Sequence, residues 1–244
     1  MTRPAVWAAV ALLCALPARA QEPAPTPEDA ARAQVRIVEQ LVDAGLAEEA
    51  LSAVAEMRGA GVAPPGLDVA QARAMHARGL STDALALLDT HLRDHRKDAA
   101  AWAVRGVILL DMGGRVDDAV ASLTRARRHT PRDATILNNL GWALLVAGKP
   151  SQAEEALRAA LVQDPSSRRA RNNLGIALAR AGRDEEALAA FRAAGSEADA
   201  RVNLAAACEW RGDVPGALTH LRAALAATPD HPAATAALAR LAAP

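Results

Sequence analysis

Aromatic residues are scarce in this chain of 244 residues. It has no tyrosine, one phenylalanine and four tryptophans. A hydrophobic core must therefore be built mainly from leucine, valine and methionine side chains. The core is expected to be lean, and we expect truncation of one buried leucine to alanine to cost about 2–5 kcal/mol.

Cysteine and net positive charge are also lacking. The two cysteines are Cys14 and Cys208. If the first twenty residues are removed, Cys208 alone remains, so no internal disulfide can form and its side chain is expected to be a small buried hydrophobe. The same removal takes away Arg3 and Arg19 and leaves 26 basic and 28 acidic residues. This balance favours neither nucleic acid nor a membrane surface as a partner.

No apolar stretch is long enough for a membrane-spanning helix. The longest stretch runs from Ala5 to Leu16, about 12 residues, whereas a bilayer requires roughly 20. It follows Arg3 and precedes the run Ala18-Arg19-Ala20. This is the pattern of a secretory signal peptide cleaved after Ala20. We therefore expect residues 1–20 to be a cleaved signal peptide and the protein to be periplasmic or secreted.

Two other fates of the N-terminus are disfavoured by the sequence. An uncleaved membrane anchor is disfavoured by the short apolar stretch. A lipid anchor at Cys14 is disfavoured because Leu13, and not a small residue, precedes it. After cleavage we expect no membrane insertion, and residues 21–30, which begin QEPAPTP, are expected to be a proline-rich linker. Thr26 can cap the first helix, with Pro27 in its first turn.

The most informative feature is a repeat. Six glycines are each followed five residues later by an alanine, and successive alanines lie 34, 35, 34, 34 and 30 residues apart. The pairs are Gly45/Ala50, Gly79/Ala84, Gly114/Ala119, Gly148/Ala153, Gly182/Ala187 and Gly212/Ala217. A period near 34 indicates a chain built from one stacked supersecondary unit.

Residues 134–167 show the unit most clearly. Apolar residues at spacings of three and four predict one helix before Gly148 and a second helix after it. Gly148 suits a helix C-terminal cap, and Pro150 suits the first turn of the next helix. Pro165 ends the second helix. Two antiparallel helices this short cannot bury their apolar faces alone, so neighbouring copies must stack.

This unit resembles the tetratricopeptide repeat (TPR) family. The family's motif of leucine, small residue, glycine, alanine, large apolar residue, alanine and proline is met here by Leu140, Gly141, Gly148, Ala153, Leu157, Ala160 and Pro165. The next two copies match again, with Phe191 and Leu221 at the large apolar position. The resemblance implies an all-α fold, a right-handed α-solenoid of about six helix hairpins with a C-terminal capping helix. The expected repeats are 31–64, 65–99, 100–133, 134–167, 168–197 and 198–231, followed by the cap 232–244.

Two copies are irregular. The third has one extra residue near Gly113 and Gly114, which leaves the phase of its first helix open. The fifth is four residues short, because Gly195 directly follows Ala194. The missing stretch is about one helical turn, so the apolar faces stay roughly in phase.

The resemblance also implies a binding groove lined by the first helix of each repeat. An asparagine of the motif can hold a bound peptide's backbone, since its amide offers both a donor and an acceptor. The matching residues are Asn139, Asn173 and Asn203, and the further groove candidates are Asn138, Trp142, Arg169, Asn172, Arg180 and Trp210. The alternative is that the asparagines serve only the repeat motif and the tryptophans pack between repeats. Asp199 stands where a carboxylate clamp would need a base.

Catalytic and metal-binding patterns are not found. The sequence has no glycine-rich phosphate loop, nucleophile elbow or isolated Ser–His–Asp set. His91 and His95 lie four residues apart and could share a metal, but no third ligand is evident, and an exposed helix face is the better interpretation. We expect no metal, no cofactor and no enzymatic activity.

The predicted function is therefore interaction. We expect an exported scaffold of the bacterial envelope that holds a protein or peptide partner in its concave groove. The chain also resembles TPR proteins of tight-adherence pilus or secretion assembly. The alternative is a structural subunit that associates with itself or docks through its convex face.

Overall fold

The computed structural model describes residues 26–242, and within them the chain forms thirteen helices and no strand. Their bounds are α1 Pro27–Asp43, α2 Ala47–Gly59, α3 Leu67–Ala77, α4 Ser81–Asp94, α5 Ala99–Met112, α6 Val116–His129, α7 Ala134–Val146, α8 Pro150–Gln163, α9 Arg168–Arg180, α10 Asp184–Ala194, α11 Glu197–Trp210, α12 Val214–Ala227 and α13 Pro232–Ala242. The predictions of a signal peptide, of its cleavage after Ala20 and of an unlipidated Cys14 lie outside the described residues.

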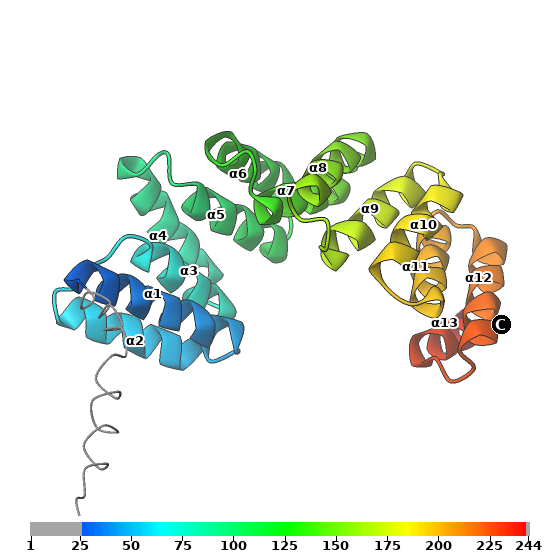
Figure 1. Ribbon diagram of the computed structural model, residues 1–244, viewed down its shortest axis with the longest axis horizontal. Helices are drawn as coiled ribbons and strands as arrows, with labels where there is room; N and C mark the ends of the chain where they lie inside the picture. Colours follow the sequence, from blue (N-terminus) through cyan, green and yellow to red (C-terminus); the bar gives the residue numbers. More distant parts are fainter. Residues whose placement is uncertain (1–25, 243–244) are drawn as a thin grey trace, which may run out of the picture.

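The helices form six hairpins that follow one another along an arc and end in α13 (Figure 1). Each odd-numbered helix contacts the next odd-numbered one, whereas no two even-numbered helices of the described chain contact each other. The first helices of the hairpins therefore lie closer together, and the arc curves around them, as Figure 1 shows for α5 and α7 on its inner side. This confirms the all-α solenoid. No helix within residues 26–242 has the length and hydropathy to cross a bilayer.

Polar cap residues begin most of the first helices of the hairpins, and glycines in turns separate the helices. Asp98, Asp133, Ser167 and Ser196 each cap the first helix of a hairpin by accepting a backbone hydrogen bond from its first turn. Gly148 has φ 72° between α7 and α8, a left-handed geometry that glycine adopts without steric cost. These residues break the chain into short helices that are separated by tight turns.

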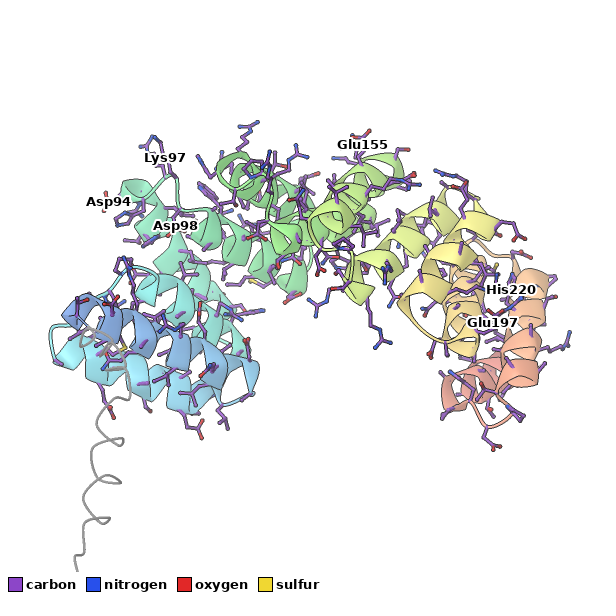
Figure 2. The ribbon with its side chains drawn as sticks, viewed as in Figure 1. Asp94, Lys97, Asp98, Glu155, Glu197 and His220 are labelled. Atoms are coloured by element: carbon purple, nitrogen blue, oxygen red, sulfur yellow. The ribbon has the colours of Figure 1, made fainter. Side chains whose placement is uncertain are left out.

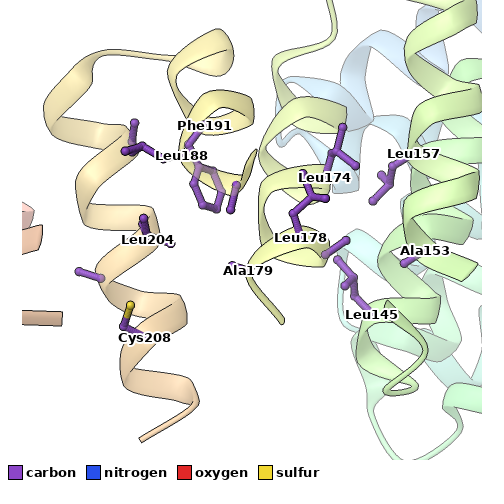
Figure 3. Packing of buried hydrophobic residues seen from close by; sticks show 14 of the residues in the cluster. Leu145, Ala153, Leu157, Leu174, Leu178, Ala179, Leu188, Phe191, Leu204 and Cys208 are labelled. Carbon is purple, nitrogen blue, oxygen red and sulfur yellow. The ribbon is translucent and has the colours of Figure 1, made fainter. Parts of the chain in front are cut away.

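The hairpins pack through a contact between a small residue and a large one. A Cβ added to Gly141 would lie 2.5 Å from Cγ of Leu157, and one added to Gly106 would lie 2.6 Å from Cγ of Leu123. The two helices of a hairpin therefore approach closely where the small residue lies, as the motif predicted. One continuous cluster of buried residues runs from Leu123 through the last three hairpins to Ala234 of α13. Figure 3 shows part of it, with Phe191 beside α9.

The same contact sets the phase that the sequence left open in the third repeat. Gly106 faces Leu123 as Gly141 faces Leu157, but Gly106 and Leu123 are one residue further apart in the chain. α5 has 14 residues where α7 has 13, and three residues separate the two helices in both hairpins, so the extra residue lengthens α5 at its C-terminal end. In this phase the repeat begins at Ala99, where α5 begins, and not at residue 100.

The first helix and the short fifth repeat differ slightly from what the sequence predicted. α1 begins at Pro27, inside the predicted linker 21–30, because Thr26 forms a capping box with Asp29. In the short fifth repeat α10 has 11 residues where α8 has 14, and only Gly195 and Ser196 separate it from α11. Ser196 caps α11 directly, in a second capping box with Asp199. At the C-terminal end, α13 covers the last hairpin with its buried Ala234, as a cap must.

Candidate functional site

A hollow of about 440 Å³ lies between the neighbouring helices α9 and α11, which are both first helices of hairpins. Phe191 of α10 lies at its base and is almost fully buried. The remaining lining side chains are Asn172, Ile176, Arg180, Asn203, Ala206, Ala207 and Trp210. The sequence predicted four of these as groove residues, namely Asn172, Arg180, Asn203 and Trp210. The structure therefore brings these four predicted residues together.

A smaller hollow of about 240 Å³ adjoins the first and shares Asn172, Phe191 and Asn203 with it. Arg168 lines this second hollow, and its Nε donates a 2.6 Å hydrogen bond to the carbonyl oxygen of Ala194. The two hollows thus meet at a pair of asparagines. We call the two hollows together the α9/α11 groove.

The two shared asparagines have unused hydrogen-bonding capacity. Within residues 26–242 the side chains of Asn172 and Asn203 make no hydrogen bond, and both are partly exposed. Each amide can donate and accept, so the pair can bond to the main chain of an extended segment whatever that segment's sequence is.

Arg180 and Trp210 close one end of the groove. The guanidinium carbon of Arg180 lies 4.4 Å from the centre of the Trp210 ring, a cation–π contact. Arg180 also donates to the carbonyl oxygen of Leu145 in the last turn of α7. This bond satisfies a carbonyl at a helix C-terminus, where positive charge is favoured. Arg180 is therefore held in place by the neighbouring repeat. Trp210 contacts Arg180 but is otherwise largely open to solvent, with 64% of its surface exposed.

Three predicted asparagines form a chain of hydrogen bonds beside the groove. Asn173 donates to Oδ1 of Asn138 at 3.0 Å, and Asn138 donates to Oδ1 of Asn139 at 3.3 Å. Asn138 was predicted to line the groove, but it is only 6% exposed and its amide is used within the fold. Its position between α7 and α9 makes it a link between neighbouring repeats. A polar residue this buried is hydrogen-bonded because an unpaired amide would be costly.

Two other predicted residues lie outside the groove. Trp142 on α7 is 40% exposed, and Arg169 on α9 is exposed, but neither lines either hollow. Their residue types matched those common at binding sites. Their helix positions, however, point them elsewhere on the surface.

Two carboxylates near the groove are already engaged. The hydroxyl of Ser196 lowers the pKa of Asp199, and His231 adds to this effect through a 3.1 Å contact. Arg240 of α13 pairs with Glu209 and lowers the pKa of that carboxyl. Asp199 lines the smaller hollow, so a terminal carboxylate would meet a negative charge there. The site therefore suits the interior of an extended segment more than its C-terminus.

The sequence predicted that His91 lies on an exposed helix face, and this prediction is wrong. Its side chain is only 9% exposed, and its ring nitrogens contact Asp68 at 2.8 Å and Asp98 at 2.9 Å. Burial acts to lower the pKa of His91, but the hydrogen bonds with Asp98 and Asp68 outweigh it and leave that pKa raised. Asp68 lies in the first turn of α3, and Asp98 caps α5. His91, on α4, therefore ties three helices together. The signal that the sequence offered was the cap at Asp98, which places a carboxylate near the end of α4.

In the described part of the chain, the acidic and histidine side chains form no metal site, and Cys208 forms no reactive-thiol site. No group of three or more potential metal ligands occurs among residues 26–242. Cys208 is buried, as predicted, and burial raises the pKa of its thiol. A buried protonated thiol is a poor nucleophile. What the α9/α11 groove offers is hydrogen bonding, apolar contact and one stacked cation.

Comparison with known families agrees with the repeat pattern. The sequence profile described as tetratricopeptide repeat matches residues 69–134, 112–161 and 138–201, and a second profile of the same description matches residues 198–241. The matched residues thus run from 69 to 241, well over half of the chain. A comparison with curated proteins gives no match.

Solved structures share the fold at low sequence identity. The chain is similar to YrrB, described as a TPR protein with an unusual peptide-binding site, with 24% identity over 70% of this chain and 90% of that one and a TM-score of 0.56. The chain is also similar to pilF of Pseudomonas aeruginosa, with 17% identity over 88% of this chain and all of that one and a TM-score of 0.65. For MamA the identity is 20%, the coverage 65% and 95%, and the TM-score 0.54.

Proposed function

The chain belongs to the tetratricopeptide repeat family, and we propose that it is a non-catalytic scaffold that binds an extended protein segment in the α9/α11 groove. The observation that carries this proposal is the pair Asn172 and Asn203. Both amides have free hydrogen-bonding groups, and they face one hollow from two helices. Because both amides stand on helices that are packed against each other, a main chain can bond to the pair without a rearrangement of the backbone.

The segment's side chains supply the rest of the affinity. An apolar or aromatic side chain fills the hollow above Phe191 and lies against Trp210. Burial of apolar area contributes about 25 cal/mol per Å². Tryptophan and arginine are also the residue types that most often dominate binding energy. YrrB, described as having a peptide-binding site, has the same fold and supports this use of it.

Export belongs to the same proposal but rests on the sequence alone. Residues 1–20 have the pattern of a cleaved signal peptide, which would place the scaffold in the bacterial envelope or outside the cell. The role in pilus or secretion assembly rests only on the resemblance of the repeat pattern. The N-terminal mass of the protein recovered from the envelope tests export, because cleavage after Ala20 leaves Gln21 first.

A peptide-display selection tests the groove. We expect the selected peptides to bind the wild-type protein and to lose at least about tenfold in affinity with Trp210→Ala or with Asn172→Ala and Asn203→Ala combined. Trp142→Ala is the matched control, since Trp142 is exposed but lies outside the groove. Its effect should stay below about twofold.

Two results would count against the groove. One is a selection that yields no binding peptide. The other is equal loss of affinity in the Trp210 and Trp142 variants. Helical content and thermal unfolding of each variant show whether the fold is intact. Sedimentation of the protein without peptide separates the competing function, since a self-associating subunit gains mass with concentration when no segment is present.

A further inference from the structure

Another surface hollow, of about 540 Å³, lies outside the α9/α11 groove. The residues that line it are distant in sequence from those of the groove and lie on different helices. It opens between α4 and α6, two even-numbered helices that do not contact each other, and α5 lies between them. Its charged and aromatic lining residues are Asp89, Arg93, Arg96, Trp102, Arg125, Arg128 and His129. We call it the arginine hollow. Because even-numbered helices are spread apart, this hollow faces away from the inner side of the arc.

The positive charge of this hollow is not compensated within the fold. Its one carboxylate, Asp89, is paired with Arg105 at 2.7 Å, and Arg105 is not part of the lining. Among residues 26–242, the guanidinium groups of Arg93, Arg125 and Arg128 make no ion pair or hydrogen bond. Four arginines therefore face one hollow whose single carboxylate is already paired with a fifth arginine.

The arginines at the ends of later helices differ. Arg192, in the last turn of α10, forms two contacts with Glu197. Arg211, just after α11, forms two with Asp184. Arginines elsewhere in the solenoid can thus have carboxylate partners that the arginines of the hollow lack within the described chain. A positive charge near a helix C-terminus interacts favourably with the helix dipole. That effect does not explain why four arginines surround one hollow.

Trp102 gives the arginine hollow a rigid base. Its indole Nε1 donates a 2.9 Å hydrogen bond to the carbonyl oxygen of Arg96, which fixes the ring against the loop after α4. The guanidinium carbon of Arg125 lies 4.6 Å from the centre of the ring. Stacking occupies the flat face of a guanidinium and leaves its N–H groups free in the plane. Figure 2 labels Lys97 and Asp98 on the loop between α4 and α5, which also carries Arg96.

We propose that the arginine hollow docks an acidic segment of a partner protein, with clustered Asp or Glu side chains on the arginines. Carboxylates suit these arginines because a guanidinium can bind one with two parallel hydrogen bonds. A nucleic acid fits less well, because phosphate-backbone binding usually spreads 6–10 contacts along a basic stripe, and this chain has a formal net charge of zero.

The test is direct binding of fluorescein-labelled hexaglutamate to the full chain at low salt, followed by anisotropy. We expect binding that weakens at higher salt. Arg125→Gln combined with Arg128→Gln should weaken it at least about tenfold. Arg127→Gln combined with Arg132→Gln is the matched control, because it removes the same charge from the same region but from exposed residues outside the hollow. The control should lose less than about twofold.

Three outcomes would overturn the proposal. The first is no binding of hexaglutamate by the wild-type protein up to millimolar concentration. The second is equal loss in both double variants, which would mean nonspecific attraction. The third is tighter binding of a fluorescein-labelled deoxythymidine heptamer, whose six phosphates match the charge, because the hollow would then prefer nucleic acid. Groove variants such as Trp210→Ala should leave hexaglutamate binding unchanged, so this test stands apart from that of the groove.

Discussion

Gly175 on α9 lies directly against the ring of Phe191 on α10. A Cβ added to Gly175 would stand 2.4 Å from Cε1 of that ring and 2.6 Å from Cδ1, both closer than real Cβ contacts. Phe191 also forms the base of the α9/α11 groove. The same contact that holds the fifth hairpin together therefore shapes the candidate site.

Gly175→Ala should destabilise the protein. The added methyl group must push the buried Phe191 ring away, and overpacking of this kind costs about 1–3 kcal/mol. Alanine's better helix propensity returns only part of this, about 1 kcal/mol. Urea unfolding should show the loss.

Gly59→Ala is the control for that substitution. Gly59 ends α2, and a Cβ there would meet nothing within 4 Å. The substitution should leave stability unchanged or raise it by up to about 1 kcal/mol. If Gly175→Ala were as stable as Gly59→Ala, the close approach of α9 and α10 would be wrong.

Asn138→Ala and Asn172→Ala should differ although both remove an amide. Asn138 is buried and bonded to Asn139 and Asn173, so its loss should cost about 1–3 kcal/mol. Asn172 makes no side-chain hydrogen bond within the described chain, so its loss should leave stability nearly unchanged. Thermal unfolding of the two variants separates a structural amide from one that is available to a ligand. Equal losses would contradict this division.

The repeat array could be predicted from sequence because its signals are local. A glycine at a turn, an alanine at a close contact and a proline after a helix act within one hairpin, and each recurs at a fixed spacing. The phase of the third repeat could not be predicted. It depends on which small residue of α5 faces the second helix, and only the contact of Gly106 with Leu123 decides that.

The candidate site was predicted in part, for a related reason. Helix position placed Asn172, Asn203 and Trp210 on the inner side of their helices, and they do line the groove. It could not show that Asn138 would be buried by the next repeat. His91 was misjudged in the same way, because one of its partners, Asp98, caps the first helix of the next repeat. The other partner, Asp68, lies on α3, the first helix of the hairpin that contains His91. Contacts between repeats depend on how the hairpins stack, which the motif does not encode residue by residue.

Arg211→Lys should loosen the junction between α9 and α11. Arg211 donates two 2.7 Å hydrogen bonds to the Asp184 carboxylate and another to the carbonyl oxygen of Ala179. Lysine cannot reproduce this fork, so we expect a loss of about 1 kcal/mol in the free energy of unfolding. Arg192→Lys is the control, because Arg192 pairs with Glu197 in an exposed position and should change stability little. Equal losses in the two variants would show that Arg211 has no special role.

The bridge formed by His91 should make stability depend on pH. Both ring nitrogens face a carboxylate, at Asp68 and Asp98, and only a protonated imidazole can donate to both. The folded-state pKa of His91 is raised above its ordinary 6.5, so its contribution is fully present below that value and is lost as pH rises through the raised pKa. The pKa of Asp68 is lowered from 3.8, so its contribution is present above 3.8 and lost as pH falls below it.

The bridge therefore stabilises most between about pH 4 and 6.5. We expect the difference in unfolding free energy between the wild-type protein and His91→Gln to be largest near pH 5.5 and to shrink by pH 8.5, since the variant has no proton to lose. His129→Gln is the control, because His129 is exposed and makes no hydrogen bond or ion pair within residues 26–242. Its difference from the wild-type protein should stay near zero at both pH values. A difference for His91→Gln that stays constant from pH 5.5 to 8.5 would mean that the imidazole bridges the two carboxylates without titrating.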